Sequence, residues 1–296
     1  MSDRIMRCIT SDGAVMAATV DTSDLVYTGA KIHLTSPVAT AALGRLLTAA
    51  AIMGNQLKQE NASITLRIKG NNSETGAVIA VSDSKGNVRG YVENPECQTE
   101  YYSNGKLNVG KAVGRSGILN VMKDYGTGEP YIGQVELVSG EIAEDITNYY
   151  AVSEQIPTVC SLGVLLNKET HEVMLSGGLF IQLLPGADNT TIDKIENNVN
   201  KLEPMTTMLA KGMTIKEICE RALSGFEVGV LDEAPIYYAC SCSREKVINA
   251  FMTLSDNDIR SLADQKGFAE AVCHFCKKKH RFSKIQLEQI IKQKYL

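Results

Sequence analysis

The sequence predicts an α+β protein in three parts: an N-terminal sheet-and-helix domain, a helical connector and a small C-terminal zinc-binding α+β domain. Three observations support this class. Strand-like and helix-like hydrophobic patterns alternate up to about residue 184, a mainly helical stretch follows, and four closely paired cysteines lie near the C-terminus. We therefore expect domains at residues 1–184, 185–235 and 236–296, in a chain long enough to form them.

Four segments of the first domain predict strands. Residues 4–10 and 13–20 are expected to form two short strands joined by a Ser-Asp-Gly turn. In residues 63–70 isoleucine and leucine alternate with polar residues, which is typical of a half-buried strand. Residues 76–95 contain two apolar runs around a turn-rich segment and predict a hairpin. A second hairpin is expected at 158–186, and its strands are apolar on both faces, which predicts a central, buried position.

Two other segments of this domain predict helices. Residues 25–57 have apolar side chains at three-and-four spacing, with a break or kink near Pro37, and residues 141–156 predict a further helix. The most apolar long stretch begins at Pro37, but Arg45 lies inside it and threonines interrupt it. We interpret this stretch as a packed helix, and we predict no membrane span.

The connector is expected to be helical and modest in apolar content. Asp188 or Asn189 can cap a helix over residues 190–202, and Pro204 ends it. Residues 214–225 predict another helix, with Gly225 as its C-cap. This composition favours a connector over a core.

The N-terminus lacks the apolar run of a signal peptide, so we expect a cytoplasmic protein. In a reducing cytoplasm, eight cysteines do not indicate a structural disulfide framework, and clustered ones are expected to bind metal or to sense oxidants. Cys8, Cys97, Cys160 and Cys219 are isolated in the sequence and are expected to stay reduced, and we interpret Cys160 as a small core residue.

The remaining four cysteines form the strongest chemical signal in the chain. Cys240 and Cys242 are one residue apart, and Cys273 and Cys276 are two residues apart. Four thiolates are the ligand set of a structural zinc site, and the small C-terminal unit needs such a staple. We therefore predict one Zn²⁺ per chain. The paired spacing disfavours four buried free thiols as the alternative.

Two histidines, His274 and His280, are possible substitute ligands, although an all-cysteine set is simpler. Each cysteine pair can also close on itself as a local disulfide. Oxidation would then consume the metal ligands. Zinc binding contributes roughly 10–16 kcal/mol in units of this size, so its loss would unfold the domain. The site is therefore a candidate redox switch.

A basic tail adjoins the second pair. Residues 277–296 hold seven lysines and arginines against one glutamate, and the rest of the chain carries a net charge of −10. Lys277, Lys278, Lys279 and Arg281 could offset the negative charge of a zinc–thiolate centre. They could equally form a solvated surface. Contact with nucleic acid is the least favoured of the three readings, because the body is acidic.

The chain resembles the redox-regulated heat-shock chaperone family, also called the 33 kDa chaperonin, over its whole length. The matching motifs are "GRLLTAAAIMG", "GYVENPE", "GEPYIGQVELVSGEIAEDI", "SEQIP", "GGLFIQLLPGA", "CSCSREK" and "CHFC". Two departures lie near the second pair, where "CHFCKKKHRF" is more basic than is usual and His280 replaces a common tyrosine. Neither departure removes a ligand.

This resemblance implies a stress-activated holding chaperone. One zinc ion would be bound by Cys240, Cys242, Cys273 and Cys276, and oxidants would form the Cys240–Cys242 and Cys273–Cys276 disulfides and release it. The connector would become mobile, and the protein would dimerise and bind unfolding clients. Refolding would be left to ATP-dependent chaperones.

Two other classes of protein share parts of this pattern. A zinc-stabilised nucleic-acid-binding protein is disfavoured by the acidic body, and a thiol oxidoreductase by the late position of Cys-x-x-Cys, outside a βαβ unit. The glycine-rich segments 110–117 and 125–130 match neither the dinucleotide-binding motif G-x-G-x-x-G nor the phosphate loop G-x-x-x-x-G-K-[ST]. The four histidines are spread along the chain and indicate no Ser-His-Asp arrangement. We therefore predict no enzymatic activity, no membrane partner and no nucleic-acid partner.

Overall fold

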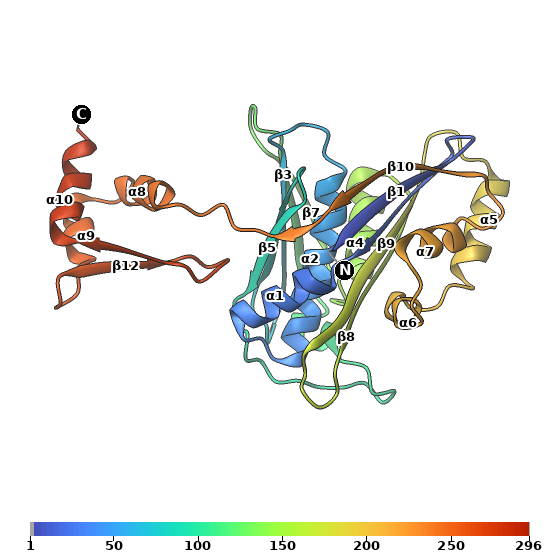
Figure 1. Ribbon diagram of the computed structural model, residues 1–296, viewed down its shortest axis with the longest axis horizontal. Coiled ribbons are helices and arrows are strands. Elements are labelled where there is room, and N and C mark those ends of the chain that lie inside the picture. Colours follow the sequence, from blue (N-terminus) through green and yellow to red (C-terminus); the bar gives the residue numbers. More distant parts are fainter. Residues whose placement is uncertain (1–2, 296) are drawn as a thin grey trace. The chain divides into compact units, whose positions relative to one another are not determined.

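The computed structural model describes residues 3–295, which divide between Ala239 and Cys240 into two compact units (Figure 1). Each unit combines helices with strands, so the predicted α+β class is confirmed. The predicted domain boundaries at residues 184 and 235 stay a prediction.

The first unit contains a five-stranded antiparallel sheet, the first sheet, in the order β10-β1-β2-β9-β8. Its strands are β1 (Arg4–Thr10), β2 (Val15–Asp21), β8 (Thr158–Leu166), β9 (Val173–Leu183) and β10 (Val228–Pro235). The hairpins predicted at residues 4–20 and 158–186 are confirmed as β1–β2 and β8–β9. The central position predicted for both strands of the second hairpin is correct for β9 and wrong for β8, which is an edge strand.

A six-stranded second sheet has the order β11-β5-β4-β3-β6-β7. Its strands are β3 (Ser63–Gly70), β4 (Val78–Asp83), β5 (Asn87–Val92), β6 (Gly117–Asp124), β7 (Tyr131–Glu136) and the short β11 (Tyr237–Tyr238). The sequence predicts β3, β4 and β5 but not β6 and β7, because the glycine-rich segments beside the latter, 110–117 and 125–130, are typical of turns. β11 pairs in parallel with β5, so the chain joins this sheet immediately before Cys240.

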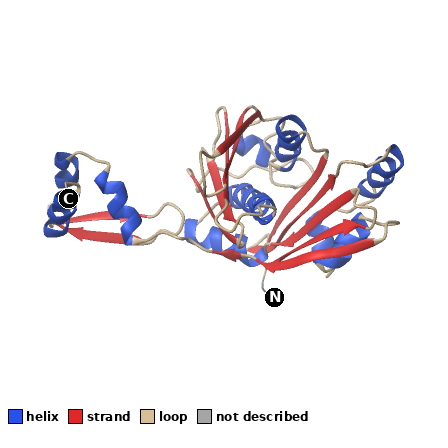
Figure 2. Ribbon diagram, turned by 90° about the horizontal axis from the view of Figure 1, so that it is seen from above, coloured by secondary structure: helices blue, strands red, loops and turns tan. Residues whose placement is uncertain are grey.

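Helix α2 (Pro37–Asn55) lies between the two sheets (Figure 2). It packs against strands of both sheets, and 89% of its most apolar 18-residue stretch is buried. A helix enclosed by sheets on both sides is apolar all round, which explains why its length and composition would also suit a membrane span. Gly44 permits this close packing, because a Cβ atom there would lie 2.6 Å from Val26 and 2.8 Å from Val164.

The remaining helices of the inner layer flank α2. They are α1 (Ser23–His33), α3 (Val109–Val113), α4 (Ala143–Tyr149) and the π-helical turn η1 (Tyr150–Glu154). The predicted break before Pro37 is confirmed, with Leu34 in the left-handed conformation (φ 53°) and Ser36 capping α2. The helix expected at 141–156 is confirmed as α4 followed by η1.

Three short helices pack against the other face of the first sheet. They are α5 (Asn189–Val199), α6 (Met205–Ala210) and α7 (Ile215–Ala222). Asp188 caps α5, as one of the two predicted caps. Together with β1, β2 and β9 these helices enclose a second apolar cluster that includes Met205, Met208 and Ile218. The expectation of a connector without a core is therefore wrong. Each helix alone has few apolar residues, but the three helices together cover one apolar cluster on the sheet.

The C-terminal unit is a small α+β arrangement. Its elements are α8 (Arg244–Met252), α9 (Asp256–Ser261), β12 (Phe268–Val272), β13 (Lys279–Ser283) and α10 (Lys284–Gln293), with β12 and β13 forming an antiparallel hairpin. Within residues 240–295 its buried apolar core holds six residues: Ile259, Ala269, Phe282, Leu287, Ile290 and Ile291. A core of this size contributes little stability to a unit of about sixty residues.

Asp3 lies at the start of the first unit and is almost fully buried. Its carboxylate accepts hydrogen bonds from the backbone N–H groups of Asp24 and Leu25 at 3.0 and 2.6 Å, and its carbonyl accepts one from Ile236. Burial raises the pKa of Asp3 to about 7, against the two helix N–H groups, which lower it.

This raised pKa predicts a pH dependence of stability. The folded protein holds the Asp3 proton more tightly than the unfolded chain, whose aspartates have a pKa of about 3.9. The stabilisation is therefore complete below about pH 4 and is lost as the pH rises through about 7. In urea unfolding of the first unit, the unfolding free energy of the wild-type protein should fall between pH 5 and pH 8. The fall should be smaller by about 1–3 kcal/mol in Asp3→Asn, which has no carboxyl group to ionise at this position.

The exposed Asp193 of α5 does not act on Asp3 and provides the control, so Asp193→Asn should keep the wild-type pH dependence. An Asp3→Asn variant with the same pH dependence as the wild type would show that Asp3 is charged in the folded protein throughout this range.

Candidate metal centre

The first cysteine pair lies on a stretch without regular structure, between β11 and α8. Cys240 follows β11 by two residues, and Cys242 directly precedes Ser243, which caps α8 through the N–H of Lys246. The backbone N–H of Cys242 donates to the sulfur of Cys240. Because β11 is hydrogen-bonded to β5 and Ser243 begins a helix, both ends of this short stretch are held by regular structure.

The second pair lies in the turn that joins β12 to β13. Cys273 follows the last residue of β12, and its N–H donates to the carbonyl of Lys278 at 2.9 Å. Lys277 has a left-handed backbone (φ 57°), and its N–H donates to the carbonyl of Cys273 at 2.9 Å. The N–H groups of Cys276 and Phe275 point to the sulfur of Cys273. This tight turn presents both sulfurs on the same side.

The four sulfurs meet at one point, and all lie within 4.8 Å of one another. The Sγ atoms of Cys240 and Cys273 are 3.7 Å apart, and those of Cys242 and Cys276 are 3.4 Å apart. In a tetrahedral site with Zn–S bonds of about 2.3 Å, neighbouring sulfurs lie about 3.8 Å apart. The four cysteines are therefore positioned to bind one metal ion. His274 and His280 do not belong to this group among residues 3–295.

The sulfurs perturb one another electrostatically. Burial, followed by hydrogen bonding to the other three thiols, raises the pKa of Cys242 to about 12, and burial also raises the pKa of Cys240. At Cys273 burial acts in the same direction, but the N–H groups of Cys276 and Phe275 outweigh it and lower the pKa. Four thiolates this close repel one another, so a divalent cation is what allows them all to ionise.

The basic side chains beside the second pair divide into two groups. Lys279 and Arg281 form ion pairs with Glu270 across the β12–β13 hairpin, at 3.0 and 2.7 Å. Lys277 and Lys278 are exposed and lie in the turn that carries Cys276. The hairpin pairs support the reading of a solvated surface for Lys279 and Arg281. Lys277 and Lys278 lie closest in sequence to the sulfurs whose charge they could offset.

The other four cysteines lie elsewhere, in the first unit. Cys97 and Cys160 are separated in the fold, and burial raises the pKa of both thiols. Cys8 of β1 and Cys219 of α7 are both buried, and their thiols lie close enough for Cys8 to raise the pKa of Cys219. No sequence signal could have revealed this contact, because more than two hundred residues separate the partners.

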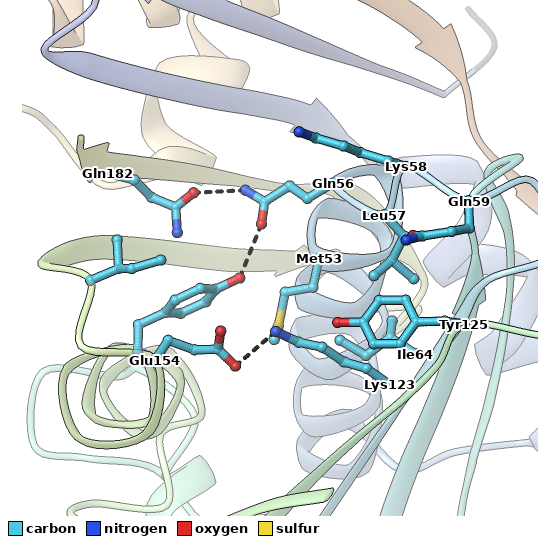
Figure 3. A pocket seen from close by; sticks show the side chains of 12 residues that line it. Met53, Gln56, Leu57, Lys58, Gln59, Ile64, Lys123, Tyr125, Glu154 and Gln182 are labelled. Carbon is cyan, nitrogen blue, oxygen red and sulfur yellow. Dashed lines mark hydrogen bonds and ion pairs between the residues drawn. The ribbon is translucent and has the colours of Figure 1, made fainter. Parts of the chain in front are cut away.

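A cavity of about 300 Å³ in the first unit is lined in part by hydrogen-bonded and ion-paired polar side chains (Figure 3). Gln56 at the end of α2 donates to Gln182 of β9 at 2.9 Å and accepts from Tyr150 at 3.1 Å. Lys123 of β6 pairs with Glu154 at 2.7 Å. These side chains satisfy one another across both sheets, so we interpret the network as a structural joint.

Comparison with known proteins gives consistent matches over the whole chain. A family model described as "Hsp33 protein" matches residues 3–283. The 33 kDa chaperonin of Acetivibrio thermocellus is 46% identical over 292 residues, covering 99% of this chain and 98% of the relative. That of Clostridioides difficile is 44% identical and covers 99% and 100%. The crystal structure of the 33 kDa chaperonin from Thermotoga maritima superposes with a TM-score of 0.91 at 34% identity, covering 100% of this chain and 99% of that chain.

The geometry predicts that metal binding requires cysteines from both segments. In reducing buffer, elemental analysis should find about one metal ion per chain, and Cys240→Ser with Cys242→Ser should reduce this to near zero because two ligands cannot hold the ion alone. The variant Cys97→Ser is the matched control, since Cys97 lies outside the centre, and it should keep its metal. Full retention of metal by the double variant would contradict the four-sulfur site.

Proposed function

The chain belongs to the Hsp33 family, and from this membership we propose that it is a holding chaperone whose activity is controlled by the four-cysteine centre. In the reduced state Cys240, Cys242, Cys273 and Cys276 bind one Zn²⁺, and the chaperone is inactive. Oxidation removes the ligands, the C-terminal unit unfolds, and apolar surface becomes available to unfolding proteins. The observation that carries this proposal is the convergence of four sulfurs from two separate segments, residues 240–242 and 273–276.

Zinc is the metal that suits this donor set. A closed set of four thiolates is typical of structural zinc, because it leaves no open position for a substrate. When bound, the ion cross-links residues 240–242 to the β12–β13 turn. The cross-link is needed because the core of this unit is small, and α8 has no fully buried residue.

Oxidation within each close pair is the simplest way to lose the ligands. Two thiols transfer two electrons to one hydrogen peroxide molecule, an S–S bond forms, and the peroxide becomes two water molecules. Cys240–Cys242 and Cys273–Cys276 are the pairs we propose, because each attacking sulfur has its partner within three residues. Cys8, Cys97, Cys160 and Cys219 stay reduced, because three of them are buried in the first unit and burial raises the pKa of the fourth, Cys160.

The chain itself connects the centre to the helices of the 185–235 segment. Cys240 follows β11 by two residues and comes soon after the edge strand β10, in which four of eight residues are exposed and none is buried. β10 is held by backbone pairing with β1 and by surface ion pairs such as Arg7–Asp232. Such pairs contribute little, about 0–1 kcal/mol each. Once the following unit unfolds, β10 borders a disordered segment and frays readily.

Fraying of β10 would free the C-terminal side of α7 and loosen α5–α7. The apolar side chains that these helices bury against the first sheet are then exposed. They include Leu202, Met205, Met208, Leu209, Ile215, Ile218 and Phe226. Flexible apolar surface that contains methionine adapts to many partners. Unfolding clients present matching apolar surface.

The remaining features of this proposal concern how the chaperone works in the cell. Binding requires no ATP, because the glycine-rich segments contribute to α3 and to turns and lack a phosphate-binding motif. The active form is a homodimer in the cytoplasm, and it transfers clients to ATP-dependent refolding chaperones. No enzymatic activity, membrane or nucleic acid is part of the proposal.

The proposal predicts that holding activity follows the redox state. Light scattering from a heat-denatured client should be largely suppressed by an equimolar amount of peroxide-treated, zinc-free protein and not by the reduced, zinc-bound protein. Peptide mapping of the same oxidised sample should find the Cys240–Cys242 and Cys273–Cys276 disulfides.

The variant Cys273→Ser with Cys276→Ser separates metal loss from disulfide formation, and it should suppress scattering without oxidant because it cannot hold the metal. Equal suppression by reduced and oxidised wild-type protein would reject the switch. Suppression by neither form would reject the holding function.

A further inference from the structure

The edge strand β8 has properties that natural proteins usually avoid at the margin of a sheet. It pairs with β9 on one side and is the last strand of the first sheet. Its sequence, "TVCSLGVLL", contains no charged residue and no proline. Charges and prolines normally protect such edges against pairing with other chains, and the irregularity in the β8–β9 pairing lies near the end of the strand, between Leu165 and Leu166. An apolar edge without charges or prolines therefore indicates a surface that binds extended polypeptide.

A groove of about 550 Å³ follows this edge along residues 162–168. One wall comes from α2 and the loop that carries Tyr101 and Leu107, and the opposite wall comes from the start of α6. α2 belongs to the inner apolar layer of the first sheet, and α6 belongs to the outer one. Because its walls come from opposite faces of the sheet, the groove lies along the edge between them.

The dimensions and lining of the groove suit one extended segment. The five strand residues that line the groove, Leu162–Leu166, span about 17 Å, which matches a client segment of about five residues. Leu162, Val164 and Leu166 give the groove an apolar floor, while Lys106 and Lys168 lie at its rim. Among residues 3–295 neither lysine has a carboxylate within ion-pair distance, so both are available to a ligand.

The positive charges of Lys106 and Lys168 also indicate which kind of polypeptide the groove binds. A second copy of the chain would bring two lysine-bearing rims together, which is unfavourable. A client segment with carboxylates beside its apolar residues would complement them. We propose that the edge of β8 binds an extended apolar segment flanked by acidic residues and adds it to the first sheet as a further strand.

This inference rests on the proposed function, and it assigns a role to α6. Thr206 lies against Gly163 of β8 so closely that a Cβ atom on Gly163 would be 2.7 Å from the Thr206 methyl group. α6 therefore narrows the groove while it is packed against the sheet. Loosening of α5–α7 on oxidation would widen the groove, so the oxidised protein should bind the segment more tightly than the reduced protein.

Two measurements on the full-length protein test the inference. A fluorescein-labelled peptide with a Val/Thr/Leu core flanked by two aspartates at each end is titrated with oxidised protein, and hydrogen–deuterium exchange is followed with and without the unlabelled peptide. Slower exchange within residues 158–168 is expected, because free-edge amides of β8 gain partners. Replacing Lys106 and Lys168 with Glu should weaken binding roughly 2- to 30-fold.

Matched controls separate charge from fold. Lys58→Glu with Lys201→Glu makes the same charge change outside the groove and should leave binding unaltered. The same peptide core flanked by lysines should bind the Lys106→Glu, Lys168→Glu variant better than the wild type. If oxidised wild-type protein suppresses aggregation but the peptide protects only residues outside 158–168, the groove is rejected and the holding function stands. If it does not suppress aggregation, the proposed function itself fails.

Discussion

The meeting of four sulfurs from two segments thirty residues apart is the constraint on which the C-terminal unit depends. Apart from it, that unit has a six-residue core, a two-stranded hairpin and three short helices. Contacts such as Phe251 against Phe282, with ring centroids 5.1 Å apart, and Arg244 over the same ring add to this core but do not enlarge it. A metal ion bound by the sulfurs would supply stability that packing alone cannot.

The first unit has the opposite balance. Its central helix α2 is enclosed by two sheets, and a second apolar cluster lies under α5–α7, so no single contact determines whether it folds. In the proposed switch, the first unit would persist under oxidation and the C-terminal unit would not. In the sequence, α5–α7 and β10 lie between β9 and the C-terminal unit. β10 is an edge strand, and α5–α7 are short helices. They are therefore the elements that a local loss of structure can loosen.

The sequence predicted best what is encoded locally. The strand at 63–70 was found from its alternation, the break before Pro37 from proline chemistry, and the metal centre from the spacing of four cysteines. Features that depend on distant segments were missed or misjudged. β8 is apolar on both faces because α2 and α6 cover it, and not because it is central. Likewise, the cluster under α5–α7 and the contact between Cys8 and Cys219 arise only when separate elements pack together.

The central claim is that loss of the metal releases the C-terminal unit first and α5–α7 as a consequence. The most direct test follows zinc release with a colorimetric chelator while pulsed hydrogen exchange reports on residues 240–295 and 189–222 after addition of peroxide. The account predicts that residues 240–295 lose protection together with zinc, that residues 189–222 follow, and that α2 stays protected throughout. Loss of protection in residues 189–222 before zinc release, or unchanged protection there after complete release, would contradict it.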